Sequence, residues 1–180
     1  PSSASGENAG RRMRSLVLVS PRATLRFHDL PGRGAPIVFV HGLGCASSHD
    51  YPAVVRDPAL APRRAILVDL LGSGFNDGPE DFEYTVAAHA QVVVMLLDAL
   101  GIAACDLYGH SMGGAVAIVA ATMDPGRVAH LVLSEPNLEP GGGVFSRSIA
   151  GQPEERYVAS GHAETIRDAA RAGNEIWAGS

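Results

Sequence analysis

Lysine is absent from this chain of 180 residues, and all 14 of its basic side chains are arginine. Acidic residues outnumber the arginines at 19, which gives a formal net charge of -5 and a pI near 5.8. Proteins that bind nucleic acid or anionic membrane surfaces usually carry a basic patch, and this balance gives no sign of one. We therefore expect neither nucleic acid nor a membrane as a partner.

Cysteine is scarce as well, with only Cys45 and Cys105 in the sequence. Neither residue stands in a C-x-x-C pair or in the Cys/His spacing of a metal site, so we expect no metal. Both thiols are expected to pack as small apolar groups and not to form a disulfide.

Long apolar runs are also missing, and none approaches the roughly 18 residues that a membrane span needs. The stretch from Leu16 to Val19 follows arginines like a signal peptide, but Ser20 and Pro21 end it after four residues. A cytoplasmic location is therefore expected. Residues 1–12 are small and polar, which is typical of a disordered lead-in or a cloning remnant.

Short β-branched apolar runs indicate the fold class. Such runs are typical of strands buried on both faces of a parallel sheet, and four are present: 37–40, 65–70, 105–109 and 130–134. Two earlier runs, 15–20 and 23–28, flank a Pro-Arg turn and predict an antiparallel hairpin.

Helical patterns alternate with these strands. One helix is expected from an N-cap at Thr85 to a stop at Gly101, and another over residues 112–123, ended by Asp124-Pro125. This alternation predicts an α/β fold with a mostly parallel, doubly wound sheet, of which six strands are visible. Residues 13–136 are assigned to this core.

The pattern changes after Ser134. Residues 137–153 are rich in Gly, Pro and Ser and are expected to be loop, followed by a polar helix over about 163–172. We assign residues 137–180 to the start of a lid segment that the chain does not complete.

The stretch 108–118, YGHSMGGAVAI, places the motif G-x-S-x-G between an apolar strand and a helix of small residues. A serine at such a sharp turn lies in strained backbone, and glycines two positions away on each side avoid collisions. The motif predicts Ser111 as a nucleophile, with the backbone N–H of Met112 as an oxyanion donor at the helix N-terminus. The alternative is an ordinary glycine-rich turn that exposes a serine.

The sequence HGLG at 41–44 follows the third strand and can supply a second oxyanion donor, which we assign to the N–H of Leu43. The alternative is that Gly42 and Gly44 only form a tight turn. These two motifs and DLLGSG at 69–74 resemble the α/β-hydrolase superfamily, especially bacterial single-domain members with HGxG, DxxGxG and GHSMGG. The resemblance covers residues 15 to about 137 and implies a sheet of the α/β-hydrolase type. Asn76 stands where the common DxxGxGxS pattern has Ser, in a loop that is structural in the family.

The resemblance implies a chain order of serine, acid and histidine, with the acid after the seventh or the sixth strand. Glu135 follows the sixth strand directly, where a carboxylate could orient a histidine and stabilise its imidazolium. We therefore interpret Glu135 as the catalytic acid. It could instead cap a loop, in which case the acid would follow a seventh strand.

A serine hydroxyl also needs a general base, and none of the seven histidines has a clear route to Ser111. His110 is expected to point away from the hydroxyl, His41 to be structural, and His162 to lie in the lid, from which it could swing inward. The other four are expected at strand ends or on helix faces: His28, His49, His89 and His130. The resemblance places the base after an eighth strand, beyond residue 180.

These features predict a serine hydrolase that cleaves an ester, thioester or lactone type of acyl substrate through an acyl-enzyme on Ser111, without a cofactor. The alternatives are a cofactor-free perhydrolase or haloperoxidase-like enzyme, and a non-catalytic ligand-binding homologue. The expected partner is a small acyl compound. A sheet edge left open by the missing strands could pair with a second copy or another chain, and the 180-residue chain alone is expected to show no turnover.

Overall fold

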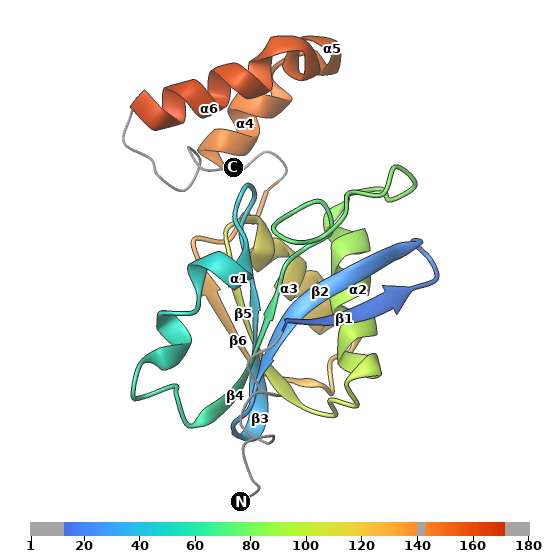
Figure 1. Cartoon of the computed structure of the whole chain (residues 1–180), viewed down its shortest axis with the longest axis vertical. Coiled ribbons are helices and arrows are strands. Elements are labelled where there is room, and N and C mark those ends of the chain that lie inside the picture. Colours follow the sequence, from blue (N-terminus) through green and yellow to red (C-terminus); the bar gives the residue numbers. More distant parts are fainter. Residues whose placement is uncertain (1–12, 140–142, 172–180) are drawn as a thin grey trace, which may run out of the picture.

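A computed structural model of the chain describes residues 13–139 and 143–171. The lead-in predicted over residues 1–12 lies outside the described part. One sheet of six strands, in the order β1-β2-β4-β3-β5-β6, runs through the core (Figure 1). Its strands are β1 (Met13–Leu18), β2 (Ala23–Leu30), β3 (Arg33–Val40), β4 (Arg63–Val68), β5 (Cys105–His110) and β6 (Val128–Ser134).

The sheet is mixed. β1 pairs antiparallel with β2, and β2 pairs antiparallel with β4, whereas β4, β3, β5 and β6 are mutually parallel. The predicted opening hairpin and the mostly parallel sheet are therefore confirmed. Val38 and Val40 in the central strand β3 have no exposed surface, as the uninterrupted apolar run predicted.

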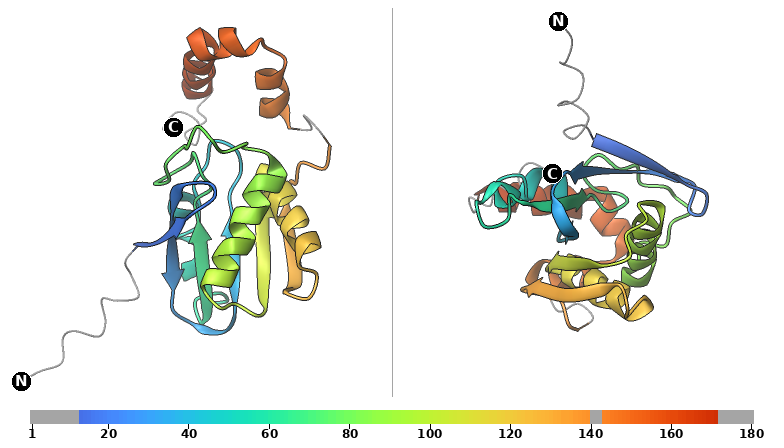
Figure 2. Two further views of the ribbon diagram at one scale, coloured as in Figure 1. Left: turned by 90° about the vertical axis from the view of Figure 1, so that its right-hand side faces the viewer. Right: turned by 90° about the horizontal axis from the view of Figure 1, so that it is seen from below.

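Helices cover the two faces of the sheet unequally. α2 (Val86–Ala99) and α3 (Met112–Met123) lie side by side on one face, and among the described residues only α1 (Ser47–Asp50) and the short η2 (Val54–Arg56) lie on the other (Figures 1 and 2). The N-cap prediction is confirmed, because Thr85 Oγ1 accepts a hydrogen bond from the Ala88 N–H at 3.1 Å. The larger apolar cluster lies beneath α2 and α3, and it includes Leu25, Val38, Val93, Leu97, Leu107 and Val116.

Strand β6 differs from the expectation. Its sequence predicted a strand buried on both faces, but β6 lies at the edge of the sheet. Leu131, Val132 and Leu133 are 37%, 52% and 37% exposed. The apolar pattern is that of a covered strand, and within the described residues no strand or helix covers its outer side.

Beyond β6 the chain leaves the sheet and forms helices above the carboxyl ends of the parallel strands (Figure 1). They are α4 (Val144–Ala150), α5 (Glu154–Arg156), η3 (Tyr157–Gly161) and α6 (His162–Arg171). The loop prediction for residues 137–153 was partly wrong, because the frequent Gly and Pro conceal the two turns of α4. None of the helices in the described part of the chain is long and apolar enough to cross a membrane.

Candidate active site

Ser111 forms the turn between β5 and α3. Its φ of 52° and ψ of −120° lie in a region that residues other than glycine rarely adopt. Two of the hydrogen bonds that hold this strained backbone come from β6 and its loop: the Ser111 N–H donates to the Ser134 carbonyl at 3.0 Å, and the Ser111 carbonyl accepts from the Asn137 N–H at 3.1 Å. Strand β6 and the loop that follows it therefore fix the serine.

Three glycines around the serine are required by close backbone contacts. A Cβ atom on Gly109 would lie 2.5 Å from the Gly113 carbonyl oxygen, and one on Gly113 would lie 2.3 Å from the His41 carbonyl oxygen. A Cβ on Gly114 would lie 2.7 Å from the Pro136 side chain. These separations are too short for any real Cβ atom. The close backbone contacts that the sequence pattern predicted around Ser111 are therefore present. The nucleophile turn and the HGLG turn pack backbone to backbone.

Residues 41–46, which contain the HGLG turn and are called the oxyanion turn after the donor predicted at Leu43, lie directly beside Ser111. A Cβ on Gly42 would lie 3.2 Å from Ser111 Cβ and 3.1 Å from His110 Nδ1. Leu43 follows and is 38% exposed. Met112 is the first residue of α3, where backbone N–H groups have no partner within the helix. The two predicted oxyanion donors thus belong to segments that meet at the serine, and their role stays a prediction.

His41 stabilises this turn from the buried side. It is fully buried, its Nε2 accepts a hydrogen bond from the Leu70 N–H at 2.9 Å, and its Nδ1 lies 2.7 Å from the Gly42 carbonyl oxygen. Accepting at Nε2 assigns the proton to Nδ1, which then donates to Gly42. Burial lowers the pKa of His41, so the ring is neutral near pH 7. These contacts support the structural role expected for His41.

Glu135 lies at the carboxyl edge of the sheet, one residue after β6, as the sequence suggested. Its side chain is 87% exposed, and its Oε2 lies 3.7 Å from Nε2 of His110. His110 thus faces Glu135, and its expected orientation away from the Ser111 hydroxyl stays a prediction. Glu135 adopts a φ of 47°, which adds a second strained residue near the serine. Whether Glu135 is the catalytic acid stays a prediction.

No histidine in the described part of the chain is hydrogen-bonded to Ser111. His162 begins α6, and its Nδ1 lies 3.2 Å from the Tyr157 hydroxyl. His89 is buried in α2 against the Phe82 ring, at 4.9 Å between ring centroids. Two other histidines contact carboxylates: His49 contacts Asp50, and His130 contacts Asp106. The site as described therefore brings together a candidate nucleophile and two candidate oxyanion donors, and no base is identified among the described residues.

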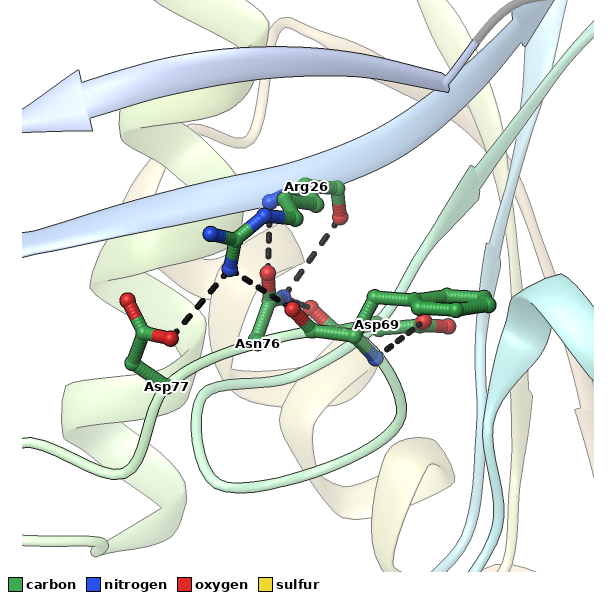
Figure 3. A network of polar contacts seen from close by, with 5 residues as sticks. Arg26, Asp69, Asn76 and Asp77 are labelled. Atoms are coloured by element: carbon green, nitrogen blue, oxygen red, sulfur yellow. Dashed lines mark hydrogen bonds and ion pairs between the residues drawn. The ribbon is translucent and has the colours of Figure 1, made fainter.

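A polar network fastens the loop after β4 to the antiparallel part of the sheet (Figure 3). Asn76 Oδ1 accepts from the Arg26 N–H at 2.6 Å, and its Nδ2 donates to the Asp69 carbonyl. The Arg26 guanidinium donates to the Phe75 carbonyl at 2.7 Å and lies 3.3 Å from Asp77. A serine at position 76 would have a shorter reach and no amide donor, so the departure from the family pattern has a structural use.

The described residues contain no group of three His, Cys, Asp or Glu side chains that could hold a metal ion.

The chain matches the model of the family described as alpha/beta hydrolase fold over residues 35–179. It is 38% identical over 120 residues to a 2-hydroxymuconate semialdehyde hydrolase of Pseudomonas putida, an alignment that covers 67% of this chain and 42% of the relative.

Two further relatives have similar names. A 2-hydroxy-6-oxo-2,4-heptadienoate hydrolase of Pseudomonas putida F1 is 38% identical over 129 residues, which covers 70% of this chain and 45% of the relative. A solved meta-cleavage product hydrolase of Pseudomonas fluorescens IP01 superposes with a TM-score of 0.61 at 28% identity, covering 69% and 45% of the two chains. The chain thus spans less than half the length of these relatives. Because the family model matches most of its length, the chain belongs to the alpha/beta hydrolase fold family.

Proposed function

We propose that this protein is a serine hydrolase of small acyl compounds, an ester, thioester or lactone, with Ser111 as the nucleophile. The observation that carries the proposal is the backbone of Ser111, held at a φ of 52° between β5 and the N-terminus of α3. Strain of this kind persists only where the surroundings enforce it, and it concentrates at functional sites. Here β6 and three close glycine contacts enforce it.

The proposed reaction begins with attack of Ser111 Oγ on the substrate carbonyl carbon while a general base accepts the hydroxyl proton. The carbonyl oxygen becomes negatively charged and accepts hydrogen bonds from the N–H groups of Leu43 and Met112. The positive end of α3 adds to this stabilisation. The leaving group then departs with a proton, and water cleaves the acyl-enzyme to release the acid and restore the serine. The base is proposed to come from a segment outside the described residues.

A second candidate rests on the relatives. The compound 2-hydroxy-6-oxo-2,4-heptadienoate, named in one of them, contains a ketone and a carboxylate but no ester or amide. Hydrolysis of such a compound has to break the carbon–carbon single bond between the ketone carbon and a neighbouring carbon, with water supplying the two new substituents. The ketone carbon gains the hydroxyl and becomes a carboxylic acid, and the neighbouring carbon takes the proton. The same serine and oxyanion donors would serve this reaction.

The test compares the natural gene product with its Ser111→Ala variant. We expect the variant to lose labelling by a fluorophosphonate probe and to lose turnover by orders of magnitude. Ser15→Ala, at an exposed position of β1, is the matched control and should retain both. Activity on p-nitrophenyl esters without activity on a 2-hydroxy-6-oxo-2,4-dienoate would favour the first function, and the reverse would favour the second. Full turnover by Ser111→Ala would refute both.

A further inference from the structure

Asp69 is a buried acidic residue to which the reaction above assigns no role. Its side chain, 2% exposed, lies just beyond β4 and accepts hydrogen bonds through both oxygens. Oδ1 accepts from the Ser48 N–H at 2.9 Å, and Oδ2 accepts from the Ser48 hydroxyl at 2.7 Å. Oδ2 also accepts from the Phe75 N–H at 3.2 Å. Asp69 and Ser48 are 21 residues apart in the sequence, so this contact joins the loop after β4 to α1.

These bonds fix the C-terminal end of the oxyanion turn. Leu70, the residue after Asp69, fixes its N-terminal end. Ser48 follows the turn in α1, whereas His41 begins it and accepts the Leu70 N–H at 2.9 Å. The consecutive residues Asp69 and Leu70 therefore hold the turn at both ends. Leu43, the predicted oxyanion donor, lies between the two anchors.

The position of Asp69 is itself closely determined. A Cβ on Gly74, which has a φ of +55°, would lie 2.3 Å from Asp69 Oδ2 and 3.0 Å from Ala46 Cβ. Only a glycine there admits the carboxylate and the turn together. Asn76 binds the Asp69 carbonyl and the backbone of Arg26 in β2, so the anchor is connected to the sheet (Figure 3).

We infer that Asp69 is a positioning residue for the oxyanion hole: it binds Ser48 and so holds the N–H of Leu43 toward a carbonyl oxygen at Ser111. The inference rests on the proposed function, because it concerns the oxyanion of that reaction. Asp69 acts through Ser48 and does not touch the substrate. Oxyanion donors act mainly in the transition state, and loss of one costs about 10²- to 10³-fold in kcat. A displaced donor therefore lowers kcat while KM changes little.

The experiment uses the natural gene product and the nearly isosteric substitution Asp69→Asn. An amide nitrogen in place of one oxygen would face an N–H or O–H donor and break part of the contact. We expect kcat to fall about 100-fold with KM within about threefold. Asp81→Asn, at an exposed position farther along the same loop, is the matched control and should leave both constants unchanged.

Substitution at Ser48 separates positioning from folding. Ser48→Ala removes the hydroxyl bond alone and should lower kcat in the same direction, whereas Ser48→Thr keeps a hydroxyl and should restore it. Hydrogen exchange should become faster in residues 42–48 of the Asp69→Asn and Ser48→Ala variants, with residues 37–40 of β3 unchanged. If Asp69→Asn does not fold, the Ser48 pair decides the question.

The inference and the proposed function fail in different ways. Wild-type kcat in both Asp69→Asn and Ser48→Ala, or equal loss in Ser48→Ala and Ser48→Thr, would overturn the positioning role even if Ser111→Ala is inactive. An active Ser111→Ala variant would overturn the proposed function. The exchange measurement on residues 42–48 would still show whether Asp69 holds the turn.

Discussion

Gly113→Ala should destabilise the fold although it places a better helix former in α3. Alanine is favoured over glycine inside a helix by about 0.5–1 kcal/mol, so an unhindered site would gain stability. At position 113, however, the new Cβ would lie 2.3 Å from the His41 carbonyl oxygen and 2.4 Å from that of Val40. Both are main-chain atoms at the end of β3 and cannot rotate away. Overpacking of this kind costs about 1–3 kcal/mol, so the collision outweighs the propensity.

The expected net loss is about 1.2 kcal/mol, the difference between the midpoints of those two ranges. For a chain of this size each kcal/mol lowers Tm by about 2–4 °C, so the variant should melt about 2–5 °C below the wild type. Thermal and urea unfolding of the 180-residue chain, followed by circular dichroism, measure this directly. The matched control is Gly126→Ala, because no atom lies within 4 Å of its added Cβ. That variant should be unchanged or more stable by up to about 1 kcal/mol.

A Gly113→Ala variant as stable as the wild type would contradict this reasoning. It would mean that α3 can move away from the end of β3 without any loss of unfolding free energy. A loss of equal size in Gly126→Ala would assign the effect to something other than the contact with β3.

Two further predictions concern α2. Thr85→Ala removes the acceptor for the Ala88 N–H and should cost about 1 kcal/mol in unfolding free energy, whereas Thr85→Ser should restore it; equal loss in both would exclude the cap as the cause. Burial, with a smaller contribution from His41, lowers the pKa of His89 from 6.5 to about 4. The unfolded chain therefore binds a proton that the folded chain does not, and stability should fall as the pH decreases from 6.5 to about 4. His89→Phe keeps a ring beside Phe82 without titrating and should flatten the curve of urea midpoint against pH; an unchanged slope would show that His89 is not responsible.

Local signals made most of the core predictable. The run 37–40 indicated a strand buried on both faces, Thr85 marked the start of a helix, and the glycines around Ser111 indicated the nucleophile turn because backbone contacts demand them. The contact of Asp69 with Ser48 leaves no such local pattern, because it joins a loop to a helix that are distant in the sequence and meet only in the folded chain.

Other features were hidden for different reasons. The apolar pattern of β6 is the same whether or not a neighbouring strand is present, so it could not reveal an edge position. Helix α4 was obscured by the glycines and prolines around it. The pairing of His110 with Glu135 joins the ends of two neighbouring strands, and the residue type of Glu135 does not indicate its positive φ.

The two hydrogen bonds that fix Ser111 have a mechanical consequence. They join its backbone to Ser134 at the end of β6 and to Asn137 in the following loop. A new strand added at the open edge of β6 would set the twist of that strand, and through these bonds the angle at which the hydroxyl is presented. The orientation of the Ser111 hydroxyl would then depend on what pairs with the edge of β6.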